Sequence, residues 1–242
     1  MVAKYDIIGV NYAELRKPDA RIAAAIQAAL GQAETVLNVG AGTGSYEPFD
    51  RQVTAVEPSL EMIRKRDPSA ARAIRASAGD LPFADDAFDA SMAILTIHHW
   101  PDKEAGLHEM RRVTHGPVVL LTFDPAHRPW LTDYLPELVS LDEAQMPAIS
   151  DYQRWLGRVR VTPVLVPHDC SDGFLYAYWR RPSAYLDARI RSGSSSFWAV
   201  HNVEPGLQKL QQDLETGAWN RRYADLLALD AYDAGYRLVV AD

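Results

Sequence analysis

The chain has 242 residues, of which 48% are hydrophobic, so it can bury a sizeable core as one domain with insertions. Its net charge of −7 disfavours nucleic acids and anionic membrane surfaces as partners. No apolar stretch is long enough to span a bilayer, the start lacks the regions of a secretory signal, and the single cysteine excludes an internal disulfide. We therefore expect a cytoplasmic protein.

The first half alternates short apolar runs with segments of helical spacing. Parallel strands need crossover connections, and helices usually provide them. The pattern therefore predicts an α/β fold: a Rossmann-like, mostly parallel sheet with helices on both faces and ligands at the carboxyl ends of the strands. Strands are expected within 35–40, 52–57, 87–97 and 117–123, and helices within 19–30, 59–66 and 101–116.

The second half loses this regularity and gains aromatic residues, which predicts an inserted substrate cover before the last strand. Within the cover, 158–167 is expected to be a strand, and the Ser/Gly run at 192–196 a mobile turn or hinge. Helices are expected at 206–214 and 223–234, and a last strand at 236–241. The single domain is thus divided into N-terminal helices (1–30), a core (31–124), a cover (125–203), and C-terminal helices with the last strand (204–242).

A glycine-rich turn follows the first strand and carries the strongest functional signal. Glycines at 40, 42 and 44 let the backbone turn sharply and approach a ligand, although such a turn can also be purely structural. Glu57 ends the second strand, near the roughly 20-residue offset at which an acid reaches a ribose hydroxyl pair. Its alternative role is a solvated strand end. A third segment offers Asp80 as an acceptor and the Leu81 backbone as a donor to an adenine edge.

Together these segments resemble the class I S-adenosylmethionine-dependent methyltransferases, especially the ubiquinone-biosynthesis-like small-molecule branch. The resemblance covers roughly Tyr5 to Phe123 and the last strand. It implies S-adenosylmethionine as cofactor and S-adenosylhomocysteine as product. The cofactor-binding residues implied are Tyr12 and Arg16 over the methionine end, Gly40, Gly42 and Gly44 around its amino-acid part, Glu57 on the ribose, and Asp80 and Leu81 at the adenine.

One position departs from that family, which usually has aspartate where this chain has Asn38. An amide can still accept a hydrogen bond, so Asn38 stays among the expected cofactor-binding residues.

The methyl acceptor should lie near the segment after the third strand. His98 and His99 stand there, and either could remove a proton from an acceptor hydroxyl; packing on the sheet is the competing interpretation. His168, Asp172 and His201 are further acceptor-side candidates. No metal site is expected, because no C-x-x-C or H-x-x-x-H pattern occurs. The segment also lacks the N-P-P-Y-like run of nucleic-acid amino-methyltransferases, so the predicted acceptor is a small molecule.

Two alternatives stay open from the sequence. A nicotinamide-dependent oxidoreductase would share the sheet and the ribose-binding acid, but Ser45 stands where its fingerprint requires the third glycine. The second alternative is a catalytically inactive cofactor-binding protein of the same fold; Asn38 is the only residue that suggests it. The sequence specifies neither the acceptor, nor whether oxygen, nitrogen or carbon is methylated, nor the oligomeric state.

Overall fold

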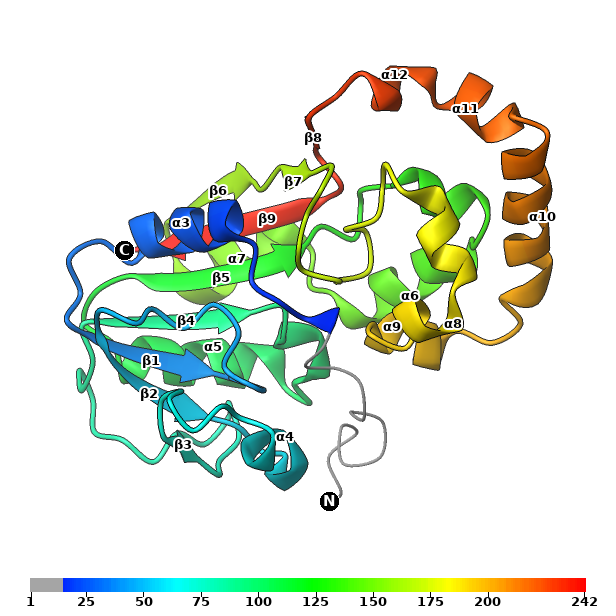
Figure 1. Cartoon of the computed structure of the whole chain (residues 1–242). Coiled ribbons are helices and arrows are strands. Elements are labelled where there is room, and N and C mark those ends of the chain that lie inside the picture. Colours follow the sequence, from blue (N-terminus) through cyan, green and yellow to red (C-terminus); the bar gives the residue numbers. More distant parts are fainter. Residues whose placement is uncertain (1–14) are drawn as a thin grey trace.

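A computed structural model describes residues 15–242, and this part of the chain forms a seven-stranded sheet in the order β3-β2-β1-β4-β5-β9-β6 (Figure 1). The first five strands in this order run parallel, and β9 is antiparallel to both of its neighbours. The expected Rossmann-like, mostly parallel sheet with helices on both faces is confirmed.

The elements of the cofactor-binding half follow the predicted alternation closely. They are α3 (Ala20–Ala29), β1 (Thr35–Val39), β2 (Gln52–Val56), α4 (Leu60–Arg64), β3 (Ala73–Ile74), β4 (Ala90–Ile94), the 3-10 turn η1 (Ile97–His99), α5 (Lys103–Arg112) and β5 (Val118–Phe123). Side-chain caps fix several helix starts: Asp19 caps α3, Ser59 caps α4 and Asp102 caps α5.

The remaining elements form the cover and the end of the sheet. They are η2 (Trp130–Asp133), α6 (Glu137–Gln145), α7 (Ile149–Leu156), β6 (Val159–Pro163), β7 (Val166–Pro167), η3 (Pro182–Leu186), α8 (Ala188–Arg191), α9 (Ser195–Ala199), α10 (Glu204–Glu215), α11 (Ala218–Arg222), α12 (Ala224–Leu227), β8 (Ala231–Tyr232) and β9 (Tyr236–Ala241).

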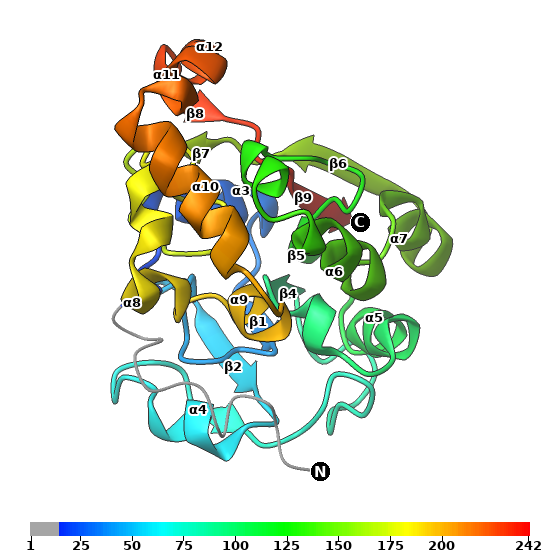
Figure 2. The same cartoon turned by 90° about the vertical axis from the view of Figure 1, so that its right-hand side faces the viewer.

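Each face of the sheet has its own buried core, because successive strand residues point to opposite sides. On one face, Val36 of β1 packs with Ile22 and Ile26 of α3 and continues into the aromatic cover. On the other face, Leu37 and Val39 of β1 pack with residues of α5 and α7. The cover helices α6, α8, α9 and α10 lie beyond the ends of the parallel strands, where they enclose the carboxyl edge (Figures 1 and 2).

Two predictions in the second half need correction. The strand predicted at 158–167 splits in two, and its first part, β6, pairs with β9 in the main sheet rather than standing within the cover. Its second part, β7, pairs with β8. The helix predicted at 223–234 is only the short α12, because the chain then extends into β8. Across residues 15–242, the helices are too short or too polar to cross a bilayer.

Candidate active site

A cavity of about 760 Å³ opens at the carboxyl ends of β1, β2 and β4, the expected position of a ligand in such a sheet. Its volume lies in the roughly 300–1,000 Å³ range of small-molecule and cofactor sites. The walls come from the glycine loop, the end of β2, the start of α4, the loop before β4, the η1 segment and the start of α5. They include Arg16, Asn38, Gly40, Gly42, Glu57, Met62, Ser77, Gly79, Leu95, His98, His99 and Asp102.

The glycine loop is fastened to the end of β2. The backbone N–H groups of Gly40 and Ala41 both donate to the carbonyl of Val56, at 2.9 and 3.0 Å. Gly40 and Gly42 have φ angles of +70° and +53°, in the left-handed region that favours glycine. A Cβ at position 40 would collide with the side chain of Thr96. The loop therefore presents bare backbone to the cavity, as close approach of a ligand requires.

Glu57 lies at the centre of this backbone network and is only 6% exposed. Its carboxylate accepts hydrogen bonds from the Gly42 N–H at 2.8 Å and the Ser59 N–H at 2.9 Å. These bonds fix the carboxylate at the cavity wall beside the glycine loop. An ionised carboxylate only accepts hydrogen bonds, so the groups that suit this position are donors such as N–H and hydroxyl groups.

Asn38 also lines the cavity, and its neighbours explain why an amide side chain suits this position. Its Nδ2 donates to Oε1 of Glu47 at 3.0 Å, while Glu47 forms a buried ion pair with Arg66 at 2.7 Å. Arg66 in turn donates to the carbonyl of Gly42 at 3.1 Å. Because Glu47 already supplies a carboxylate, position 38 requires a hydrogen-bond donor.

Three predicted cofactor contacts lie elsewhere. Asp80 is exposed and outside the cavity lining; the preceding residues Ser77 to Gly79 reach the cavity instead. The Leu81 N–H donates to Glu109 of α5 at 2.9 Å, which occupies the donor expected to face adenine. Gly44, also outside the lining, has a φ of +95° and shapes the turn. For Asp80 and Leu81 the reason is that the loop before β4 doubles back between Ser77 and Asp80, which the composition of the segment does not reveal.

Both predicted catalytic histidines lie in the cavity wall. Their rings are in contact on η1, with centroids 3.8 Å apart and planes tilted by 49°. Leu95 sets the direction of the backbone that leads into this segment. Its φ of +51° is uncommon for a side chain of its size. Backbone strain of this kind concentrates at functional sites. The two imidazoles are thus brought to the edge of the sheet, as the sequence predicts.

A smaller inner chamber of about 50 Å³ lies beside the main cavity, and the two share Arg16, Leu95 and His98 in their walls. The far side of the chamber holds Asp142 of α6 and Tyr176, whose hydroxyl donates to Asp142 Oδ2 at 2.9 Å. Burial raises the pKa of Asp142 to about 6, while the Tyr176 hydrogen bond and the charge of Arg128 act in the opposite direction. Sequence reasoning missed Asp142, because one acid in an otherwise ordinary helix gives no signal.

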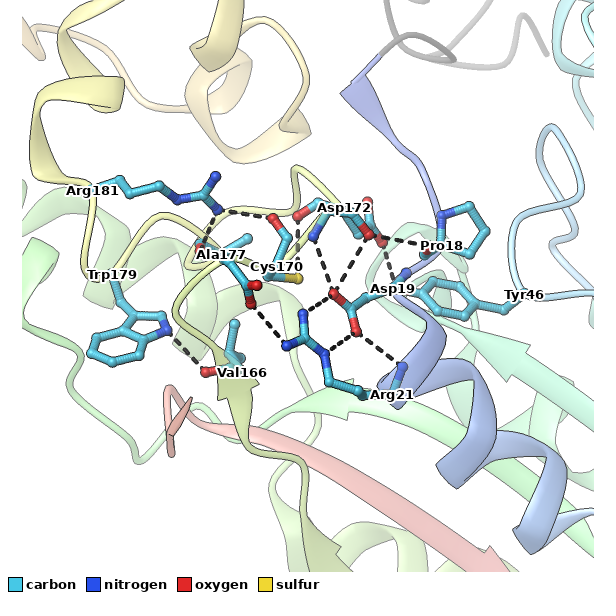
Figure 3. A network of polar contacts seen from close by, with 12 residues as sticks. Pro18, Asp19, Arg21, Tyr46, Val166, Cys170, Asp172, Ala177, Trp179 and Arg181 are labelled. Atoms are coloured by element: carbon cyan, nitrogen blue, oxygen red, sulfur yellow. Dashed lines mark hydrogen bonds and ion pairs between the residues drawn. The ribbon is translucent and has the colours of Figure 1, made fainter. Parts of the chain in front are cut away.

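Arg16 is held in place by a buried carboxylate of the cover. Its guanidinium donates to Asp172 at 2.6 and 3.3 Å, and the Tyr46 hydroxyl donates to the same carboxylate at 2.9 Å. Figure 3 shows Asp172, Tyr46, Asp19 and Arg21 side by side; the Asp19 N–H donates to the Tyr46 hydroxyl at 3.4 Å, and the Asp19 carboxylate accepts from Arg21 at 2.7 Å. The same carboxylate accepts from the Ser171 backbone N–H at 3.1 Å. These bonds fasten the segment before α3 to the cover at the mouth of the cavity.

The other residues predicted in this part of the chain have different outcomes. Tyr12 lies outside the described residues. His168 and His201 are in the walls of neither chamber, whereas Asp172 acts through Arg16.

Comparison with known proteins gives consistent results. A family model described as "Methyltransferase domain" matches residues 37–120. A solved structure from Anabaena variabilis ATCC 29413, described as "Putative methyltransferase from antibiotic biosynthesis pathway", is 37% identical; the match covers 94% of this chain and 99% of that one, with a TM-score of 0.85. The demethylmenaquinone methyltransferase of Paenarthrobacter aurescens is 28% identical over 83% of this chain and 81% of its own length.

A more distant structure shares the fold. The geranyl diphosphate C-methyltransferase of Streptomyces coelicolor A3(2), solved with S-adenosyl-L-homocysteine, is 18% identical with a TM-score of 0.51; the match covers 90% of this chain and 76% of that one.

Proposed function

The chain belongs to the class I S-adenosylmethionine-dependent methyltransferases, and from this premise we propose that it methylates a small aromatic acceptor of the quinol type. The cofactor and the reaction type follow from the family. The acceptor class is supported by the similarity to demethylmenaquinone methyltransferase across most of both chains. It is also supported by aromatic and aliphatic side chains beside the cavity, including Trp100, Phe174 and Leu95.

The cavity walls fit the proposed cofactor. Glu57 is the residue we assign to the ribose hydroxyls, because its buried carboxylate faces the cavity at the end of β2. The bare backbone of Gly40 to Gly42 suits the amino-acid part. Ser77 to Gly79 are assigned to the adenine edge, replacing Asp80 and Leu81.

When bound, the cofactor supplies a methyl group on a positively charged sulfur. The acceptor's lone pair forms the new bond to the methyl carbon as the sulfur–carbon bond breaks, and S-adenosylhomocysteine leaves. For a hydroxyl acceptor, the proton must go to a base. We assign that base to His98, because it borders both the cofactor cavity and the inner chamber; the His99 ring lies against it at a tilt.

The observation that carries the proposal is the arrangement of the two chambers. The larger is bounded by the glycine loop and Glu57, and the smaller adjoins it at His98. An acceptor in contact with the inner chamber would therefore lie beside the cofactor, and holding two reactants in this way lowers the entropic part of the barrier.

Calorimetric titration tests the proposal directly. Purified protein is titrated with S-adenosylhomocysteine, and with NADH in a parallel cell. We expect saturable one-site binding of S-adenosylhomocysteine alone. Binding of NADH in preference would instead support the oxidoreductase alternative, and binding without turnover of any quinol in an acceptor screen would support an inactive protein.

A further inference from the structure

The inner chamber has the dimensions of a site for one substituent. Its volume of about 50 Å³ is small beside the roughly 760 Å³ of the main cavity, so it suits one substituent rather than the whole acceptor. It adjoins the main cavity at Arg16, Leu95 and His98. A ring in the main cavity could therefore direct one substituent into it.

Asp142 is the charged group of this chamber and is incompletely hydrogen-bonded by the protein. Its side chain is buried, with 6% exposure, and Oδ2 accepts from Tyr176. Among the described residues, no hydrogen bond reaches Oδ1. Because Asp142 lines the chamber, this oxygen keeps its capacity to accept a hydrogen bond from a group bound there.

We propose that the inner chamber binds a hydroxyl substituent of the methyl acceptor, which donates a hydrogen bond to Oδ1 of Asp142. This inference rests on the proposed function and deepens it, because it names the residue that recognises a free hydroxyl of the acceptor. Asp142 is a specificity residue here, and Tyr176 positions it. A methyl ether at the same place cannot donate, and it adds a methyl group to a chamber of this size. Sites built to bond a hydroxyl reject analogues without one, because their buried polar groups are left unpaired.

The charges around Asp142 make the preference depend on pH. Arg16 and His98 border the chamber from the main cavity, Tyr176 and Tyr236 line its inner wall, and Arg128 acts from the loop after β5. Above a pH of about 6 the carboxylate is ionised and accepts from a hydroxyl. Below that pH it is protonated, and the preference for a hydroxyl over an ether should decline. Tyr176→Phe removes a donor that stabilises the ionised form, so the decline should occur at a higher pH.

The test uses 2-naphthol and 2-methoxynaphthalene, in which a methyl group replaces the hydroxyl hydrogen; neither is readily oxidised. Each is titrated into full-length protein saturated with S-adenosylhomocysteine at pH 7.5. We expect the naphthol to bind about 10- to 100-fold more tightly, the factor for a hydrogen bond to a charged group. In Asp142→Asn the preference should fall by about three- to tenfold, since a neutral acceptor forms a bond roughly half as strong.

Glu143→Gln is the matched control, because it removes one negative charge from the neighbouring exposed position of α6. This variant should keep the preference. Equal binding of the two probes, binding of neither, or an unchanged preference in Asp142→Asn would overturn the inference. Loss of the preference in Glu143→Gln would also overturn it, because a general charge effect would then explain the result. Failure of S-adenosylhomocysteine to bind would instead refute the proposed function.

Discussion

The amide nitrogen of Asn38 donates a hydrogen bond to Oε1 of Glu47, 3.0 Å away. This contact links the first strand to the Glu47–Arg66 ion pair, and Arg66 continues it to the carbonyl of Gly42. The glycine loop is therefore held by a buried network. Of the pair Asn38 and Glu47, only Glu47 carries a negative charge. The departure from the family at position 38 is compensated within the chain.

Asn38→Asp should weaken cofactor binding and lower stability. The substitution places two carboxylates about 3 Å apart in a buried site, and we expect a cost of roughly 1–3 kcal/mol, as for a buried polar group that loses its partner. Glu47→Gln in the same chain should restore part of the loss, because its amide can donate where Asn38 did. Urea unfolding and titration with S-adenosylhomocysteine measure both effects. Purely additive single and double variants would show that the two residues are not coupled.

Glu57→Ala should weaken S-adenosylhomocysteine binding by about 1.5–3 kcal/mol, the range for hydrogen bonds to a charged group. The loss has two sources: the ribose contact, and the two bonds that fix Gly42 and Ser59. Asp50→Asn, a half-exposed acid before β2, serves as the control and should leave the affinity unchanged. Calorimetric titration measures the affinity of both variants for S-adenosylhomocysteine. An unaltered affinity in Glu57→Ala would refute the assignment of this residue.

His98→Asn should lower kcat by about 10²- to 10⁴-fold with a hydroxyl acceptor, the usual contribution of general acid–base catalysis. The affinity for the cofactor should change much less, because glycine-loop and Glu57 contacts are retained. His108→Asn on the exposed side of α5 is the control. Steady-state kinetics across pH provide the measurement. A fall in kcat below about threefold would indicate that His98 shapes the cavity without transferring a proton.

Asp172→Ala should destabilise the fold by about 3–5 kcal/mol, because it removes one partner of a buried ion pair. The same carboxylate also accepts from Tyr46, so a second buried donor loses its acceptor. Asp169→Ala breaks an exposed pair with Arg21 and should have little effect. Denaturant titration of both variants tests this contrast. Similar small changes in the two would mean that the Arg16 contact does not stabilise the cover.

Asp142 should make stability decrease as the pH rises through about 6. Burial raises its pKa from 3.8 to about 6 in the folded chain, so the folded state binds this proton more tightly than the unfolded state does. The stabilisation is complete below about pH 4 and is lost as the group ionises. The stability of Asp142→Asn relative to the natural chain should therefore increase by up to about 3 kcal/mol between pH 4 and 7.5. Urea unfolding at several pH values measures the difference, and a constant difference would contradict it.

The sequence predicts the parallel half of this fold well, because local signals determine it. Apolar runs, capping residues and positive-φ glycines place β1, β2, β4, β5 and the helices between them. The partner of β6 could not be predicted in the same way. Its residues are half-exposed and end at Pro163, as suits the edge of a sheet, and only the tertiary arrangement shows that β9 lies beside it.

The site residues show the same difference between those that local signals predict and those that depend on the tertiary arrangement. Gly40, Gly42 and Glu57 follow directly from strand ends, and the structure brings them together around one cavity. The prediction of Asp80 rests on a turn and on the family resemblance, but hydrogen bonds between distant segments decide which residue of that turn faces inward. Asp142 lies on α6 of the cover, and no local sequence pattern predicts how the short helices of the cover pack.

The position of β9 has a consequence for how the protein is made. This strand lies between β5 and β6 and hydrogen-bonds to both, although the ribosome completes it after either neighbour. Until Tyr236–Ala241 has emerged, β5 and β6 therefore lack the strand between them, and apolar residues of β5 such as Val119 and Leu121 have no partner strand beside them. Nascent chains that stop short of β9 should consequently engage chaperones or aggregate, whereas synthesis of the last strand allows the sheet to close.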